Sequence, residues 1–223
     1  MDEVHPLPGR LLRPIRLAVL ISGGGTTLTN LADRIQSGTL NAEIPLVIAS
    51  RPDCGGIARA AGHGLRCEVV TRASVANVQE FSDRIFALCL EAQVDLVICA
   101  GFLALIQIPA SFAGRVMNIH PSLIPAFCGK GFHGHHVHEA VLARGARVSG
   151  CTVHFVDDEY DHGPIILQYV VSVEDDDTPT SLAARVFAAE CDALPQAIQL
   201  FASGCLEIRG NRVHRIPRFS AEA

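Results

Sequence analysis

An asparagine and a histidine stand two positions apart at the end of an apolar run, in the segment Asn118-Ile119-His120-Pro121. Residues i and i+2 of a strand point to the same side, so the Asn118 and His120 side chains are expected to face one pocket. An amide can stabilise a developing oxyanion while an imidazole moves a proton, which suits a reaction at a carbonyl carbon. A carboxylate further along the chain, Asp161, would orient the ring and favour its charged form. The alternative is that Asn118 and His120 only cap a turn before Pro121.

A second candidate site is the segment 22–27, Ser-Gly-Gly-Gly-Thr-Thr, between the first expected strand and the first expected helix. Glycines let the backbone turn tightly and bring its N–H groups near an anion. The helix that follows adds unpaired donors and a favourable dipole, and both threonine hydroxyls can donate. The segment lacks the lysine of a Walker A motif and does not complete GxGxxG. It is therefore a candidate phosphate site, with an unliganded glycine turn as the alternative.

Apolar runs of strand length alternate with segments of helical spacing in the first half of the chain. In 78–92 the apolar residues recur every three or four positions, the pattern of a helix with one face on a core. Such alternation is typical of a Rossmann-like α/β fold, in which a mainly parallel twisted sheet carries helices on both faces. The expected strands are 17–21, 46–49, 68–71, 96–99 and 116–119, and the expected helices are 28–35, 57–61 and 78–92.

The second half of the chain has a different pattern. Two further strands are expected at 149–155 and 165–173, separated by the acidic loop 157–161. This arrangement suggests an antiparallel C-terminal extension of the same sheet. A long helix is expected over 180–203, ending near Gly204, because glycine is favoured just after a helix C-terminus.

Length and composition favour one domain. The chain has 223 residues, of which 49% are hydrophobic and 18% charged, enough for one well-packed core. We expect a single domain over 15–216, preceded by a flexible proline-containing tail at 1–14 and followed by a C-terminal tail at 217–223.

Charge and cysteine usage indicate a class of partner and a compartment. A net charge of -5 argues against a general affinity for nucleic acid or anionic membranes, so small-molecule substrates are expected. Cys89, Cys99 and Cys151 lie in apolar runs, and no CxxC pair is present, so neither disulfides nor a zinc ribbon is indicated. The N-terminus lacks the pattern of a signal peptide, and the apolar runs are too short to span a membrane. We expect a reduced, cytoplasmic environment.

From residue 17 to about residue 208 the sequence resembles the glycinamide ribonucleotide formyltransferases of purine synthesis. The resemblance implies a Rossmann-like formyltransferase fold, 10-formyltetrahydrofolate as the formyl-donor cosubstrate, and no metal. It also implies a monomer or a homodimer with small-molecule substrates. The matching motifs are Ile-Ser-Gly-Gly-Gly-Thr at 21–26, Ala-Gly-Phe at 100–102, Asn-Ile-His-Pro-Ser-Leu-Ile-Pro at 118–125, Gly-Cys-Thr-Val-His-Phe-Val at 150–156, and Asp-His-Gly-Pro-Ile-Ile at 161–166.

The resemblance assigns a role to each candidate residue. It implies that Asn118 stabilises the oxyanion, His120 donates the proton and Asp161 keeps the imidazolium available, while His154 supports the site. On the substrate side it implies that Gly25, Thr26 and Thr27 contact the ribose phosphate and that Glu190 contacts the amine. The folate is expected to meet Asn118 and Asp161 and the mainly backbone groups of Leu103, Ala104, Leu105, Ile106, Asp157, Asp158, Glu159 and Tyr160.

The sequence departs from the family pattern at several positions. Thr26 and Thr27 stand where Ser-Asn is commoner, and either pair can donate hydrogen bonds. Cys191 replaces a histidine after Glu190, and His162 replaces a small residue. Arginine is common in relatives at Ala104 and Val78, and Arg72 or Arg84 are possible substitutes for the Val78 cation.

Other signals and activities are weaker. His133, His135, His136 and His138 invite a metal site, but no carboxylate or cysteine completes the ligand set. The main alternative activity is hydrolysis of 10-formyltetrahydrofolate to formate, which in the family goes with His-His-Ser after Asn-Ile, where this chain has His-Pro-Ser. A catalytically silent folate- or nucleotide-binding protein is the alternative outside enzymes.

Overall fold

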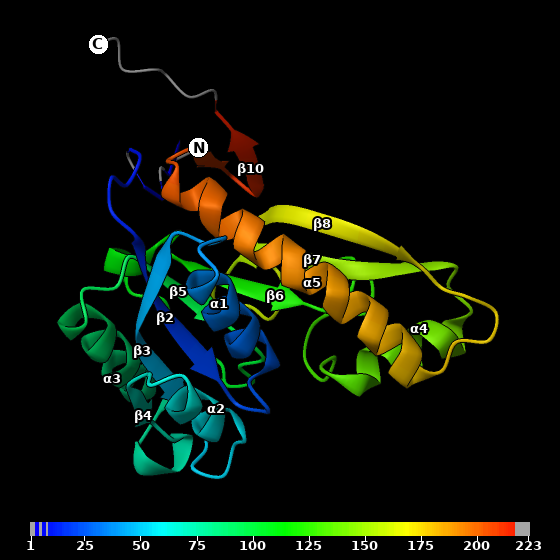
Figure 1. Cartoon of the computed structure of the whole chain (residues 1–223), viewed down its shortest axis with the longest axis horizontal. Coiled ribbons are helices and arrows are strands. Elements are labelled where there is room, and N and C mark those ends of the chain that lie inside the picture. The colour runs from blue at the N-terminus through cyan, green and yellow to red at the C-terminus, as the bar shows by residue number, and fades with distance from the viewer. Residues whose placement is uncertain (1–2, 5, 8, 217–223) are drawn as a thin grey trace.

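The computed structural model describes residues 3–4, 6–7 and 9–216, which form one sheet with helices on both sides (Figure 1). The helices are α1 (Thr26–Gln36), α2 (Gly56–Gly62), α3 (Val78–Glu91), α4 (His135–Arg144) and α5 (Pro179–Ala202), with 3-10 turns at Arg72–Ser74 and Ala110–Phe112. The strands are β1 (Glu3–Val4), β2 (Ile15–Ile21), β3 (Ala42–Ala49), β4 (Cys67–Val69), β5 (Leu96–Cys99), β6 (Val116–His120), β7 (Val148–Phe155), β8 (Ile165–Ser172), β9 (Leu206–Arg209) and β10 (Arg212–Arg215).

The strand order in the described part of the chain is β1-β9-β10-β8-β7-β6-β5-β2-β3-β4. Strands β4, β3, β2, β5 and β6 run parallel, whereas β7 pairs antiparallel with both β6 and β8. The predicted parallel sheet with an antiparallel C-terminal extension is therefore confirmed. From β2 the chain moves outward to β3 and β4, then returns to β5 on the other side of β2. The carboxyl ends of β2 and β5 thus flank a topological switch point, where open α/β sheets form a crevice.

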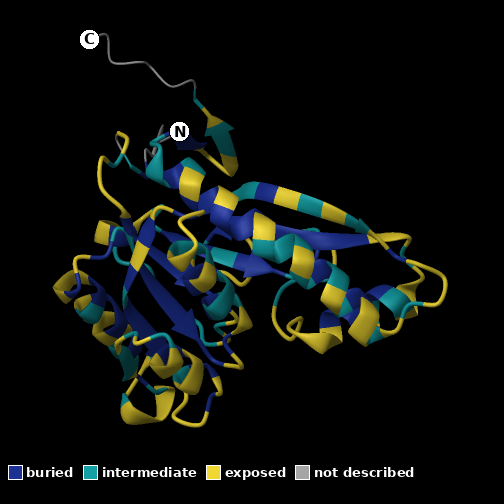
Figure 2. Cartoon of the chain, in the orientation of Figure 1, coloured by how far each residue is buried: buried dark blue, intermediate teal, exposed yellow. Residues whose placement is uncertain are grey.

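Alternation along β2 divides the core between the two faces of the sheet. Leu17, Val19 and Ile21 are fully buried on the face covered by α1 and α5, whereas Ala18 and Leu20 are buried on the face covered by α3. Figure 2 shows the result, with β2 and β7 almost entirely buried, β8 partly exposed and the helices exposed along one side. Burying a Leu, Ile or Val side chain contributes roughly 1.5–3 kcal/mol, so these central strands are a rigid support for the loops at their ends.

Local signals at both ends explain the length of α5. Thr178 caps its N-terminus: the Thr178 hydroxyl accepts from the Ser181 N–H, and the Ser181 hydroxyl accepts from the Thr178 N–H. Pro179 occupies the first turn of the helix. Gly204 follows the C-terminus with φ 65°, a conformation that glycine adopts without strain. The helix confirms the one expected over 180–203. No described helix is both long enough and apolar enough to cross a membrane.

The start of the chain differs from the flexible tail expected at 1–14. Glu3–Val4 pair antiparallel with β9, Pro6 is buried, and the Leu11 N–H donates to the Ala202 carbonyl at 2.9 Å. The short hairpin of β9 and β10, which lacked a clear sequence signal, provides the edge that β1 extends. The tail expected at 217–223 lies outside the described residues.

Gly163 is expected to tolerate no side chain. A Cβ at this position would lie 2.0 Å from the Phe155 carbonyl oxygen, which is backbone and cannot move aside. We predict that Gly163→Ala destabilises the fold by about 1–3 kcal/mol, measured by urea denaturation. Gly62→Ala is the matched control, since a Cβ there meets nothing within 4 Å and the residue lies in a helix. A Gly163→Ala protein as stable as the Gly62→Ala protein would refute the steric argument.

Candidate active site

A cleft of about 720 Å³ lies at the carboxyl ends of β2, β5 and β6, at the topological switch point of the sheet. It brings together residues that are distant in sequence, from the first glycine-rich turn to the last helix. Its walls include the predicted residues Thr26, Thr27, Leu103, Asn118, His120, Tyr160, Asp161 and Glu190.

The side chains of Asn118, His120, His154 and Asp161 form one network in this cleft. Asn118 Nδ2 lies 3.2 Å from Asp161 Oδ1 and 3.1 Å from His154 Nε2. His120 Nδ1 lies 3.4 Å from Asp161 Oδ2, and His120 Nε2 lies 2.9 Å from the Phe127 carbonyl oxygen. Both nitrogens of the His120 ring therefore face acceptors, an arrangement that a protonated imidazole satisfies.

Burial and charge compete at this network. Burial lowers the pKa of His120 below its usual value, and the Asp161 carboxylate and the Phe127 carbonyl offset only part of that shift. The sequence suggested that Asp161 favours the charged ring, and its effect has that sign, but burial outweighs it. Burial also acts to raise the pKa of Asp161, yet the His154 ring, 3.8 Å from Oδ1, and the charge on His120 leave that pKa lowered. The result is an ionised carboxylate beside an imidazole that releases its proton readily.

The backbone around the network is held by buried hydrogen bonds. The Thr152 hydroxyl donates to the Ser122 carbonyl at 2.6 Å and accepts from the Ile124 N–H, which ties the turn after β6 to β7. Asp161 has φ 55°, a left-handed conformation that is uncommon outside glycine. Its Oδ2 accepts the Gly129 N–H at 2.9 Å, so the carboxylate is held by backbone as well as by side chains. Such strain, balanced by surrounding contacts, is typical of functional sites.

The glycine-rich turn has the geometry of an anion site. Gly25 precedes α1 with φ 78°, and a Cβ there would lie 2.7 Å from Gly56 Cα, so only glycine fits. No side chain caps α1 and its first turn has no acidic residue, which leaves its N–H groups available to a ligand. Gly25 itself does not line the cleft, whereas Thr26 and Thr27 do. Arg59 adds positive charge behind the turn, donating to Thr29 Oγ1 at 3.3 Å.

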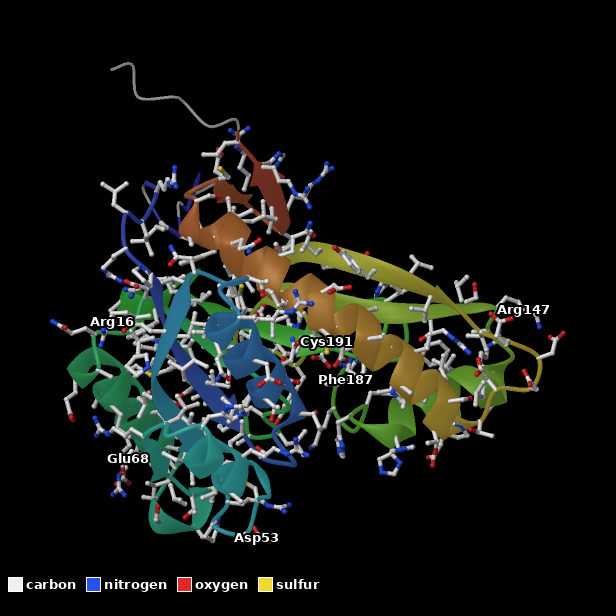
Figure 3. The ribbon with its side chains drawn as sticks, viewed as in Figure 1. Arg16, Asp53, Glu68, Arg147, Phe187 and Cys191 are labelled. Atoms are coloured by element: carbon white, nitrogen blue, oxygen red, sulfur yellow. The ribbon has the colours of Figure 1, made fainter. Side chains whose placement is uncertain are left out.

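Glu190 faces the cleft from α5, together with Phe187 and Ala183. These residues are three and four apart, so they share one face of the helix. Figure 3 shows Phe187 and Cys191 on this part of α5, in the middle of the molecule. Burial raises the pKa of Glu190 from 4.5 to about 7. Among the residues that the structure describes, Glu190 has no ion-pair partner, so its carboxylate is suited to accept hydrogen bonds from a bound amine.

The raised pKa of Glu190 predicts a pH-dependent stability change. The unfolded chain loses this proton near pH 4.5, while the folded chain keeps it to about pH 7, so the ionisation costs stability as pH rises through that window. We predict that Glu190→Gln stabilises the protein above pH 7, by up to about 3 kcal/mol, and has little effect at pH 4.5. Thermal unfolding at both pH values checks this. Glu174→Gln, an exposed site, serves as the control; a Glu190→Gln gain equal at both pH values would contradict the assignment.

A smaller pocket of about 60 Å³ adjoins the cleft and also contacts Asn118, His154 and Asp161. Apolar side chains form one wall, and the acidic loop 157–161 forms the other. Leu103 lines only the larger cleft, and Asp158 lines neither. The pocket includes the other predicted folate contacts, Ala104, Leu105, Ile106, Asp157, Glu159 and Tyr160.

The structure places the residues at which the sequence departs from the family pattern. Val78 begins α3 and lines neither pocket. Arg72 lies over the Phe81 ring, 5.7 Å from its centroid, and Arg84 pairs with Glu80. His162 Nδ1 lies 2.7 Å from Asp157 Oδ2, which raises its pKa through that hydrogen bond.

The histidine-rich segment forms the rim of the cleft. His135 and His138 line it, and His138 is buried with Nδ1 unpaired. Within residues 3–4, 6–7 and 9–216, no group of three or more His, Cys, Asp or Glu side chains is placed to hold a metal ion.

Sequence reasoning missed part of the lining. Phe187 and Ala183 had a usable signal, since they precede Glu190 at helical spacing. Phe132 and Gly134, in the loop between β6 and α4, had none, because their place over the cleft depends on non-local contacts. The residues missed include Phe102, Phe132, Gly134, Ala183 and Phe187.

Comparisons with known proteins agree with this geometry. A family described as Formyl transferase matches residues 15–198. A chloroplastic phosphoribosylglycinamide formyltransferase from Arabidopsis thaliana is 40% identical over 178 residues, or 78% of this chain, and the match spans 61% of that relative's length. Glycinamide ribonucleotide transformylase 1 from Symbiobacterium toebii has 37% identity and a TM-score of 0.84, covering 93% of this chain and 96% of that one. A formyltetrahydrofolate deformylase from Pseudomonas syringae pv. tomato has 23% identity and a TM-score of 0.80, covers 92% of this chain and 67% of that one, and shares the fold alone.

Proposed function

Since this chain belongs to the formyl transferase family, we propose that it transfers the formyl group of 10-formyltetrahydrofolate to the amine of N1-(5-phospho-D-ribosyl)glycinamide. The products are formylglycinamide ribonucleotide and tetrahydrofolate, a step of purine synthesis. One observation carries the proposal: the glycine-rich turn before α1, the Glu190 carboxylate and an amide–imidazole–carboxylate network line the same cleft. These three elements suit a phosphorylated amine and a formyl donor.

Binding of the amine substrate is assigned to the glycine-rich turn and to Glu190. Thr26, Thr27 and the first N–H groups of α1 would hold the phosphate. Glu190, ionised above about pH 7, would accept from the amine and orient its lone pair toward the formyl carbon. The smaller pocket beside Asn118 would receive only part of the formyl donor, and backbone contacts there would tolerate Ala104.

The chemical step is assigned to the network. When the amine attacks the formyl carbon, negative charge develops on the formyl oxygen, and the Asn118 amide would stabilise it. Asn118 Nδ2 already contacts Asp161 Oδ1 and His154 Nε2, so one of these contacts must be exchanged for the oxyanion. His120 would donate a proton to the departing nitrogen of the folate, and the proton that the attacking amine loses would restore the ring. Asp161 would hold the ring and stabilise its charge.

The test is an assay with purified protein and 10-formyltetrahydrofolate, with and without the ribonucleotide, following deformylated folate and formylated product. Folate turnover that requires the ribonucleotide and matches product formation is the expected result. Formate release in its absence would support the hydrolase instead, and no turnover in either tube would support a silent binding protein.

We also propose a reduced cytoplasmic compartment, which the eight free cysteines support.

A further inference from the structure

The chain contains a single lysine. Lys and Arg together number 18, and the only lysine among them is Lys130. This residue lines the cleft described above, on an exposed part of its rim. The one primary-amine side chain of the protein therefore stands where two anionic substrates are proposed to bind.

The local backbone holds Lys130 at the tip of a tight turn. The Phe132 N–H donates to the Gly129 carbonyl at 3.0 Å, which closes a turn with Lys130 and Gly131 at its centre. Gly131 has φ 95°, the conformation that a type II turn requires at its third residue and that glycine readily adopts. Gly129 has φ 90°, so the residues on both sides of Lys130 need glycine.

The turn is attached to the reaction centre. The Gly129 N–H donates to Asp161 Oδ2 at 2.9 Å, so the residue before Lys130 is bonded to the carboxylate that faces His120. The backbone of Lys130 therefore lies beside the reaction centre, within reach of which a lysine side chain can extend. Among the described residues, no carboxylate forms an ion pair with Lys130.

Charge in the cleft is poorly balanced without Lys130. Asp161 and Glu190 are acidic, and the cation nearest the phosphate turn, Arg59, does not line the cleft. Lysine is a compact point charge on a flexible stem, which suits an anionic oxygen whose position is set by other contacts.

We propose that Lys130 binds an anionic oxygen of a cleft ligand, either the phosphate of the amine substrate or a carboxylate of the formyl donor. The inference rests on the proposed function for the identity of those two ligands. In this role Lys130 is a binding residue that closes over the ligand from the rim, and it takes no part in proton transfer.

The kinetic test compares Lys130→Ala with Lys130→Arg and with Arg144→Ala, an exposed cation in the last turn of α4 that does not line the cleft. We expect Lys130→Ala to raise one KM roughly fivefold, with kcat little changed and the effect weaker at high salt. A higher KM for the ribonucleotide identifies the phosphate, and a higher KM for the formyl donor identifies the carboxylate. Lys130→Arg should retain most of the affinity. No change in either KM for Lys130→Ala, or an equal change for Arg144→Ala, would overturn the proposal.

A second test needs no enzymatic activity, so its failure is distinct from failure of the proposed function. Pyridoxal 5′-phosphate condenses with a lysine amine, releasing water, and borohydride reduces the imine to a stable amine. Because the chain has one lysine, peptide mapping separates its adduct from that of the N-terminal amine. Ribose 5-phosphate or tetrahydrofolate should each be tried as protectant, and protection of Lys130 by one of them is expected. No labelling of Lys130, or labelling that neither compound reduces, would refute a site at this residue.

Discussion

His120→Ala is expected to lower the turnover number by about 10²–10⁴ while leaving both KM values within a fewfold of the unaltered protein. The imidazole is the one group in the cleft that combines a readily released proton with two acceptors, and alanine supplies neither. Because His120 is 3% exposed and its Nε2 faces the Phe127 carbonyl, the substitution also leaves a cavity and an unpaired acceptor. Steady-state kinetics with the ribonucleotide and formyl donor provide the measurement.

Two control variants separate chemistry from folding. His120→Gln keeps a donor able to reach the Phe127 carbonyl, so its thermal stability should recover toward that of the unaltered protein while turnover stays low. His136→Ala removes an exposed histidine of α4 that does not line the cleft, and its turnover should be unchanged. Near-normal turnover in folded His120→Gln would exclude His120 as the proton donor.

Asp161→Asn is expected to reduce turnover by about 10² or more and to destabilise the fold by about 1–3 kcal/mol at neutral pH. Asp161 accepts from the Gly129 N–H and from Asn118 Nδ2, and it faces the ring of His120. An asparagine has only one acceptor oxygen, so its NH₂ group must face one of those donors. Loss of the negative charge also removes the interaction that raises the pKa of His120, leaving burial unopposed by a carboxylate.

The stability effect of Asp161→Asn has a definite pH dependence. The folded pKa of Asp161 is lowered, so its carboxylate contributes stability above the unfolded value of 3.8, and that contribution is lost as pH falls through the lower folded pKa. Urea denaturation should therefore show a large difference between the two proteins at pH 7 and a smaller one in acid. Asp192→Asn is the control, because Asp192 is an exposed residue of α5 that pairs with Arg34. This substitution should change neither turnover nor the pH dependence of turnover. A folded Asp161→Asn protein with normal turnover would remove Asp161 from the mechanism.

Several parts of the fold were predictable because they depend on local rules. Glycine at 25, threonine at 178 and glycine at 204 mark helix boundaries through backbone freedom and capping, which need only neighbouring residues. The alternation of buried strands with amphipathic helices indicates a parallel sheet, whose carboxyl edge is the natural place for a site. The spacing of Asn118 and His120 likewise follows from strand geometry alone.

Other parts depend on contacts between distant residues. The pairing of β1 with β9 carries no sequence signal. A two-residue strand forms only where an existing strand offers an unpaired edge, and that depends on the tertiary structure. The place of Lys130 at the rim follows from the bond between the Gly129 N–H and Asp161, residues 32 positions apart. The sign of the His120 pKa shift also required the structure, because sequence suggests a carboxylate partner but not the burial that outweighs it.

The sequence by itself determined the elements, the fold class and the chemical types in the cleft, since each depends on residue identity and short-range spacing. Tertiary structure alone decided which of those groups touch and how burial sets their charge. It excluded Asp158 from both pockets, paired His162 with Asp157, and brought Glu190 and Lys130 to the same cleft. The physical reason is that hydrogen-bond distance and desolvation are properties of three-dimensional neighbourhoods, which strand and helix periodicity do not encode.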